Sequence, residues 1–328
     1  MSMSANAIIV RFRDLFFNFI KLSMQIDNKK ILFIVVVMLF TISLLINHIF
    51  CLILTIFRFI LGSHIDSQIR VVVESQTSGL STSQEKIQKL SKWFNENIKY
   101  IENDILFNLL RLSSCGIPEE ITFIIKGGRC EEWAKLYLKL LNYANISGRI
   151  VRFIEDHAFL EVMINDSWVP LEPPLGVVSY EYYKLTRNVS KAYIIEKEKI
   201  IELTKSYANT GLLIVSALYN NTPVKHSTIC IYSKNLIVID PYNYKKPILI
   251  IRNKTDEQGI FKEELGQGLY DILVFRFNFP FTCFSGIEKN YTLSPNKINE
   301  VKLKIERKDF PFCIADIINI QKTYWGCI

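Results

Sequence analysis

Cys130, His157 and Glu172 have the side-chain types that nucleophilic catalysis on an amide requires. A thiolate attacks a carbonyl carbon, an imidazole takes up the thiol proton and returns it to the departing amine, and a carboxylate holds the imidazole in one tautomer. We therefore predict Cys130 as nucleophile, His157 as base and Glu172 as the residue that orients the base.

Cys130 follows two glycines and an arginine and precedes residues 131–143, which are rich in the helix formers Leu, Ala, Lys and Glu. At the first turn of a helix, free backbone N–H groups and the helix dipole favour a thiolate. A single cysteine there is more often structural, so the prediction depends on its partners. Trp133 is a candidate wall of the site or part of its substrate and oxyanion contacts, although a helix tryptophan is more often simply packed.

His157 and Glu172 fall on two segments that are predicted to form a hairpin. Asn165-Asp166 is a typical two-residue turn between residues 158–164 and 167–171, which are rich in β-branched and aromatic residues. With that turn, paired positions sum to 331, so Glu172 faces Phe159 and projects from the same face as His157. A glutamate can span the diagonal gap, roughly 7–8 Å between backbones, to an imidazole nitrogen. The alternatives are a surface histidine at a strand end and a solvated glutamate before two prolines.

The sequence predicts further helical and strand segments before this hairpin. Residues 83–103 repeat apolar side chains at helical spacing and predict an amphipathic helix, whereas residues 149–154 predict a further strand before the hairpin.

Four segments together resemble the core motifs of the transglutaminase-like superfamily: 128–134 (GRCEEWA), 149–151 (RIV), 156–162 (DHAFLEV) and 168–173 (WVPLEP). The resemblance covers about residues 83–174. It implies an α+β, papain-like core in which the cysteine, the histidine and the acid form a triad that acts through a thioester. No cofactor is implied.

Within that superfamily, residues 128–134 are most similar to peptide:N-glycanases, which have glycine where this chain has Glu131. Two departures stand out. The family's third residue is usually aspartate where Glu172 stands, and the paired C-x-x-C zinc motifs typical of those glycanases do not occur in this sequence.

From about residue 206 onward helical periodicity disappears. Short apolar runs separated by Gly, Asn, Pro and Asp predict an all-β sandwich of the transthyretin-like or Ig-like kind over residues 206–328. The order of turns and strands in residues 255–274 resembles the carboxypeptidase regulatory-like sandwich.

The apolar residues 31–57 predict a transmembrane helix, because that length crosses a bilayer with some tilt. Basic residues are denser in residues 1–30 than just after the span, so the positive-inside rule predicts a cytoplasmic N-terminus and an exported catalytic domain over residues 58–205. Residues 7–24 suit either an interfacial helix or an extension of the anchor. A buried core helix, or a turn between two short apolar segments at Asn47 and His48, is the alternative for the span itself.

Sequons for N-glycosylation occur after the span and not before it, which favours an exported glycoprotein. The candidate acceptors are Asn145, Asn165, Asn188, Asn220, Asn253 and Asn290.

The predicted topology places the seven cysteines of the chain in two environments, the membrane and the exported side. Cys51 is expected in the membrane, and five beside Cys130 fall on the exported side, where disulfides persist. The connectivity is not deducible, and Cys230 with Cys283 and Cys313 with Cys327 are candidate pairs. The four histidines are scattered, so no metal site is predicted.

The net charge of +7 is spread along the chain without a Lys/Arg run, which argues against nucleic-acid binding. The sequence therefore predicts a single-pass cell-membrane protein whose extracellular domain is a cysteine protease or amidase acting on a protein or glycoprotein. A peptide:N-glycanase-like amidase and a catalytically inactive surface or adhesion protein remain as alternatives, and the oligomeric state is not predicted.

Overall fold

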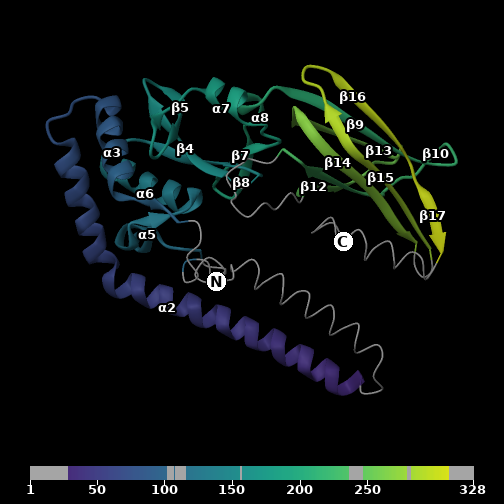
Figure 1. Ribbon diagram of the computed structural model, residues 1–328, viewed down its shortest axis with the longest axis horizontal. Coiled ribbons are helices and arrows are strands. Elements are labelled where there is room, and N and C mark those ends of the chain that lie inside the picture. Colours follow the sequence, from purple (N-terminus) through teal and green to yellow (C-terminus); the bar gives the residue numbers. More distant parts are fainter. Residues whose placement is uncertain are drawn as a thin grey trace, which may run out of the picture. The chain divides into compact units, whose positions relative to one another are not determined.

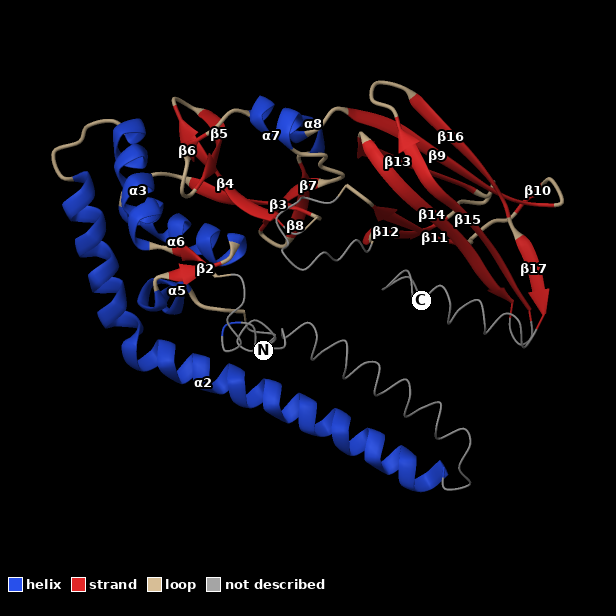
Figure 2. Ribbon diagram, viewed as in Figure 1, coloured by secondary structure: helices blue, strands red, loops and turns tan. Residues whose placement is uncertain are grey.

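The computed structural model describes residues 29–101, 107, 116–155, 157–235, 247–278 and 282–309. Figures 1 and 2 show helices concentrated in the first part of the chain and strands in the rest. The described residues form two compact units. The helical unit contains the residues up to Ser147 together with Pro173–Gly176, and the strand unit contains Gly148–Glu172 and the residues from Val177 onward. The predicted α+β character is therefore confirmed.

In the part of the chain that the structure describes, the helical unit contains four helices and one short pair of strands. Its elements are α2 (Lys29–Thr77), α3 (Ser83–Asn97), β1 (Lys99–Tyr100), α5 (Glu119–Ile125), β2 (Gly127–Gly128) and α6 (Cys130–Tyr143). Helix α3 begins at a capping box, in which the Thr82 hydroxyl accepts the Glu85 N–H and the Glu85 carboxylate accepts the Thr82 N–H. It ends at Asn97, six residues before the predicted end.

Helix α2 is much longer than the predicted transmembrane helix. It continues without interruption from Lys29 to Thr77, and its 49 residues span about 74 Å, more than twice the roughly 30 Å of a bilayer's hydrocarbon core. Its second half is part of the folded unit, because Ile65, Ile69 and Val73 are buried and the helix packs against α3, α5 and α6.

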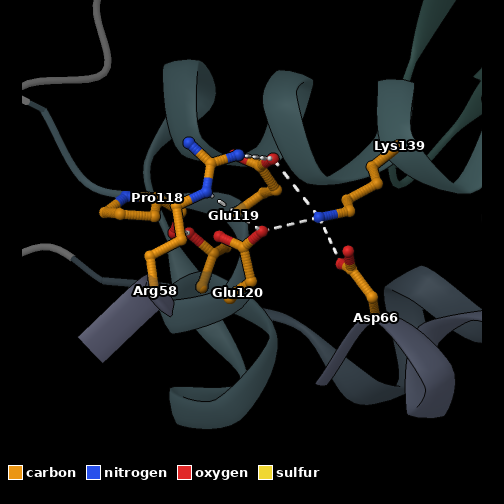
Figure 3. A network of polar contacts seen from close by, with 7 residues as sticks. Arg58, Asp66, Pro118, Glu119, Glu120 and Lys139 are labelled. Carbon is orange, nitrogen blue, oxygen red and sulfur yellow. Dashed lines mark hydrogen bonds and ion pairs between the residues drawn. The ribbon is translucent and has the colours of Figure 1, made fainter. Parts of the chain in front are cut away.

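Ion pairs reinforce this packing (Figure 3). Lys139 of α6 lies 2.5 Å from Asp66 of α2 and 2.6 Å from Glu120 of α5, and Arg58 of α2 lies 3.2 Å from Glu119. Burial alone would lower the pKa of Lys139, but the surrounding carboxylates outweigh it and raise that pKa. The second half of α2 is thus held against α5 and α6 by ion pairs as well as by apolar contact.

A six-stranded sheet opens the strand unit. Its order is β6-β5-β4-β3-β7-β8, and the elements of this region are β3 (Gly148–Phe153), β4 (His157–Ile164), β5 (Ser167–Glu172), β6 (Gly176–Val177), α7 (Tyr180–Thr186), β7 (Ala192–Glu196), β8 (Lys199–Glu202) and α8 (Thr204–Tyr207). Strands β4 and β5 pair Ile164 with Ser167 and Leu160 with Leu171, so paired positions sum to 331 as predicted. Both turn residues, Asn165 and Asp166, have positive φ, which is the conformation of a two-residue type I′ turn.

The remaining strands form two sheets that share one hydrophobic core. The four-stranded sheet contains β9 (Thr210–Tyr219), β10 (Thr222–Pro223), β13 (Ile260–Gly266) and β16 (Ile298–Lys304), and the five-stranded sheet contains β11 (Thr228–Ser233), β12 (Ile248–Lys254), β14 (Gly268–Asn278), β15 (Thr282–Leu293) and β17 (Glu306–Asp309). Val215 and Leu303 of the first sheet and Ile231 and Val274 of the second belong to that core. The predicted β-rich C-terminal region is confirmed, whereas its transthyretin-like or Ig-like assignment stays a prediction.

The described cysteines correct one expectation. Cys230 lies opposite Leu273 and Cys283 lies opposite Phe277, so they are two strands and four residues apart, which is far beyond the reach of a disulfide. The candidate pair Cys230–Cys283 is therefore wrong, although each of these residues is disulfide-bonded, as is Cys51. Cys115, Cys313, Cys327 and residues 7–24 lie outside the described residues.

Candidate active site

Cys130 is the first residue of α6, as predicted, and a tightly packed glycine pair leads into it. Strand β2 pairs in parallel with β1, and the Ile101 N–H donates to the Gly128 carbonyl at 3.0 Å. A Cβ atom on Gly128 would lie 2.8 Å from the Cβ of Glu132 and 3.2 Å from a methyl carbon of Thr122. Glycine is needed here because the backbone passes directly against the following helix.

The start of α6 provides the electrostatic setting for a reactive thiol. Arg129 caps the helix, and its N–H donates to the Glu132 carboxylate at 3.1 Å, so the first turn is held in place. Cys130 is half-buried and retains its thiol, whereas the other described cysteines are in disulfides. The helix dipole favours the thiolate at this position, and partial exposure leaves the sulfur accessible.

Trp133, the candidate wall or oxyanion contact, packs within the helical unit. Its ring makes edge-to-face contacts with Phe94 at 5.7 Å and Tyr100 at 5.3 Å between centroids. Its indole N–H is buried and has no hydrogen-bond acceptor among the described residues. The contacts are those of a packed tryptophan, and a role with substrate stays a prediction.

His157 and Glu172 meet in the strand unit. The Nε2 atom of His157 lies 2.8 Å from Oε1 of Glu172, and both side chains are about nine-tenths buried. The contact joins the first residue of β4 to the last residue of β5, which is the diagonal relation that the hairpin register predicts. With Nε2 occupied by the carboxylate, Nδ1 is the ring nitrogen left to exchange a proton with another group.

Two further residues stabilise this carboxylate and were not found from the sequence. The Tyr183 hydroxyl donates to Glu172 Oε1 at 2.9 Å, and the positive charge of Arg187 acts on the same group. Burial would raise the pKa of Glu172, but His157, Arg187 and Tyr183 outweigh it and hold that pKa below its usual value. Glu172 is thus ionised at neutral pH and able to stabilise an imidazolium.

An aromatic cluster fixes the plane of the imidazole. The His157 ring stacks on Phe159 at 5.6 Å and lies 5.8 Å from Phe153, and Phe159 in turn stacks on Tyr183 at 4.5 Å. Phe153, Phe159 and Tyr183 belong to one buried hydrophobic cluster. A histidine held on its flat face and at one nitrogen has little freedom to rotate, which suits a catalytic base.

The six sequon asparagines are all exposed. Five of them lie near the ends of elements or in turns, and Asn290 lies within β15 beside an irregularity in its pairing with β14. Asn145, Asn165, Asn220 and Asn290 have positive φ. Exposure is a requirement for an acceptor, and glycosylation itself stays a prediction. Among the residues that the structure describes, no group of three or more His, Cys, Asp or Glu is arranged to hold a metal ion.

One helical segment in the described part of the chain, Cys51–Thr77, is long and apolar enough to cross a membrane by length and composition. Several of its large apolar side chains near the N-terminal end are exposed, including Leu52, Ile53, Ile56 and Phe59. Such a helix is compatible with a membrane anchor.

Solved structures with some similarity to this chain include proteins named as proteases and as a transglutaminase. A candidate cysteine protease from Cytophaga hutchinsonii has 17% identity and a TM-score of 0.28, with 34% of this chain and 38% of that chain covered. A candidate protease from Parabacteroides distasonis has 11% identity and a TM-score of 0.33, with coverages of 70% and 50%. A protein titled TGase has 14% identity and a TM-score of 0.27, with coverages of 35% and 32%.

The chain spans no more than half the length of any of these three proteins, and scores this low add nothing about its chemistry. No curated protein matches the sequence. The family model described as the transglutaminase-like superfamily matches residues 70–173, a stretch that contains all three predicted catalytic residues. This part of the chain therefore carries a transglutaminase-like superfamily domain.

Proposed function

We propose that this protein is a membrane-anchored, outward-facing cysteine hydrolase that cleaves amide bonds in protein or glycoprotein substrates. Cys130 is the nucleophile, His157 the base and Glu172 the residue that orients the base. The observation that carries the proposal is the 2.8 Å contact between His157 Nε2 and Glu172 Oε1, at the residues that the superfamily motifs single out.

In the proposed reaction, the Cys130 thiolate attacks the substrate carbonyl carbon and an oxyanion forms. Backbone N–H groups at the start of α6 are the natural donors to that oxygen. His157, charged after taking the thiol proton, gives a proton to the departing amine, and a thioester remains. His157 then removes a proton from water, the hydroxide attacks the thioester, and the acid is released as the thiol reforms.

Hydrolysis is favoured over transfer to an amine because Cys130 is partly exposed and so open to water. The sequence also offers no second pocket for an amine substrate. The glycanase-like segment 128–134 supports one narrower candidate, an amidase that releases glycans from glycoproteins.

Two observations support the outward-facing topology. The basic residues near the apolar stretch 31–57 lie mainly before it. The sequon asparagines all lie beyond that stretch, and they are exposed.

The proposal is tested on the full-length protein in detergent with two variants, Cys130→Ala and His157→Ala. An ordinary thiol has a pKa of about 8.5, and a neighbouring His157 would lower it. We therefore expect iodoacetamide to alkylate Cys130 well below that pH. We also expect each variant to lose hydrolysis of a peptide library by about 10³-fold or more.

A glycopeptide and its unglycosylated counterpart are assayed in parallel. Release of the glycan alone identifies an amidase for glycoproteins, and cleavage of the plain peptide identifies a protease. The proposal would be overturned if neither substrate is hydrolysed and if Cys130 has an ordinary thiol pKa that His157→Ala does not change. That result would favour an inactive surface protein.

A further inference from the structure

The turn between β3 and β4 contacts the C-terminal sheets as well as its own sheet. This turn comes immediately before His157, and its described residues are Ile154 and Glu155. The Ile154 side chain packs against the hydrophobic core that the two C-terminal sheets share. Glu155 is only 4% exposed, which is unusual for a glutamate in a turn.

Glu155 is bonded to residues that come much later in the chain. Its Oε1 atom accepts the Ser190 backbone N–H at 2.7 Å and the Ser233 hydroxyl at 3.3 Å. Ser190 and Ser233 are themselves joined by a 2.6 Å hydrogen bond between their hydroxyls. Because Ser233 is the last residue of β11, this network connects the turn before His157 directly to the five-stranded sheet.

Asn235 extends the network into the sheet. Its N–H donates to the Ser233 hydroxyl at 3.1 Å, its amide nitrogen donates to the Ser190 hydroxyl at 3.0 Å, and its amide oxygen accepts the Leu269 N–H of β14 at 2.7 Å. Connected and buried hydrogen bonds of this kind fix the positions of their members closely.

No cation balances Glu155 among the described residues. Its second oxygen, Oε2, is buried without a hydrogen-bond partner there, and burial raises the pKa of this carboxyl to about 7, against the hydrogen bonds from Ser190 and Ser233. A buried carboxyl without a counter-charge lowers the stability of the fold, which favours a functional role for Glu155.

We propose that Glu155 is a positioning residue, through which the C-terminal sheets set the orientation of His157. This inference rests on the proposed function, in which His157 is the catalytic base. The hydrogen bonds of Glu155 to Ser190 and Ser233 fix the backbone two residues before His157. Loss of these bonds displaces the start of β4 and weakens the contact of the imidazole with Glu172. The C-terminal sheets then act on catalysis only through the hydrogen bonds that Glu155 makes to them.

The same interface provides a matched control. Lys191 forms ion pairs with Glu263 of β13 and with Glu202 of β8, and none of these three side chains is bonded to Glu155. The backbone of Lys191 does contact the turn, because its carbonyl accepts the Ile154 N–H at 3.1 Å. Glu263→Gln therefore weakens a side-chain attachment of the C-terminal sheets next to the turn and leaves the hydrogen bonds of Glu155 in place. Ser233 is chosen for mutation in preference to Ser190, because Ser190 also completes the sequon of Asn188.

The experiment measures the rate of iodoacetamide alkylation at Cys130 against pH, read by peptide mass spectrometry on the full-length protein in detergent. A well-placed His157 lowers the pH midpoint, so a displaced His157 raises it toward the ordinary thiol value of about 8.5. We expect Glu155→Ala to raise the midpoint by about one pH unit, with an approximately tenfold slower reaction below it, and Ser233→Ala to raise it by less. Glu155→Gln, whose amide oxygen can accept the same two bonds, should keep the wild-type midpoint, and so should Glu263→Gln.

Each outcome has a definite meaning. A wild-type midpoint in Glu155→Ala, or in Ser233→Ala if the first variant does not fold, overturns the positioning role. A Glu155→Gln midpoint equal to that of Glu155→Ala also overturns it, because the effect would then come from charge. Failure of the proposed function is distinguishable, since wild-type protein would already show an ordinary midpoint that His157→Ala leaves unchanged.

Discussion

Two buried glutamates of one sheet, Glu161 on β4 and Glu172 at the end of β5, are surrounded in similar ways. Glu161 is bonded to the hydroxyls of Tyr207 at 2.6 Å and Tyr180 at 2.8 Å, as Glu172 is to that of Tyr183 at 2.9 Å. Their cationic partners differ. Glu161 lies 2.6 Å from Arg149, whereas Glu172 lies 2.8 Å from His157.

This difference separates a structural ion pair from a functional one. Arginine stays charged at every physiological pH, so the Arg149–Glu161 pair is permanent, and the stacking of Arg149 on Trp168 at 4.1 Å adds to its rigidity. Histidine changes charge near neutral pH, so only the second pair can take part in proton transfer. Substitutions at Glu172, Glu161 and Tyr183 test whether the His157–Glu172 pair is functional and the Arg149–Glu161 pair structural.

The largest effect is expected for Glu172→Gln. The amide preserves the shape of the side chain but removes the negative charge that stabilises the imidazolium, so we expect kcat/KM to fall by about 10² to 10⁴. Steady-state hydrolysis of the best peptide substrate, with circular dichroism to confirm folding, measures it. Loss of less than a factor of about five would mean that Glu172 does not orient a catalytic base.

A smaller effect, and one on stability, is expected for Glu161→Gln. Removal of this partner leaves the largely buried Arg149 with only the more distant and exposed Glu196, at 3.5 Å, as a counter-charge, which costs about 3 kcal/mol of unfolding free energy. Urea denaturation provides the measurement. Activity per folded molecule should be unchanged, and a fall in kcat comparable to that of Glu172→Gln would contradict the division between the two sites.

The smallest effect is expected for Tyr183→Phe, which removes one hydrogen bond from Glu172 and costs about 1 kcal/mol. That bond favours the ionised carboxylate, so its loss raises the pKa of Glu172. Ionised Glu172 stabilises the fold above its ordinary pKa of 4.5, and this contribution is lost as the pH falls through the lowered folded pKa. In the variant this loss should be smaller and complete at a higher pH, as thermal unfolding between pH 3 and 6 would show. An unchanged pH profile would place Tyr183 outside the network that controls Glu172.

Features set by neighbouring residues were predictable from the sequence. The Asn165-Asp166 turn fixed the register of β4 and β5, and with it the side on which His157 and Glu172 project. The glycine pair and the helix-forming residues after it located the first turn of α6 at Cys130. Helix α2 was only partly predictable, because apolar composition ended the prediction at residue 57 whereas packing and ion pairs keep the chain helical to Thr77.

Features that depend on distant residues were not predictable. Tyr183 comes eleven residues after Glu172, and Ser233 comes 78 residues after Glu155, with no local pattern that relates them. Disulfide pairing was not predictable either, since Cys230 with Cys283 was one candidate pair and the sheet register excludes it.

The sequence by itself therefore determined the types, order and local geometry of the residues proposed for catalysis, because turns, helix starts and strand alternation arise from interactions over a few residues. Only the tertiary structure decided which glutamate faces a histidine, which faces an arginine and which, Glu155, is buried without a cation among the described residues. Burial and long-range hydrogen bonds set the pKa values of Glu155 and Glu172, and both depend on which distant segments pack together.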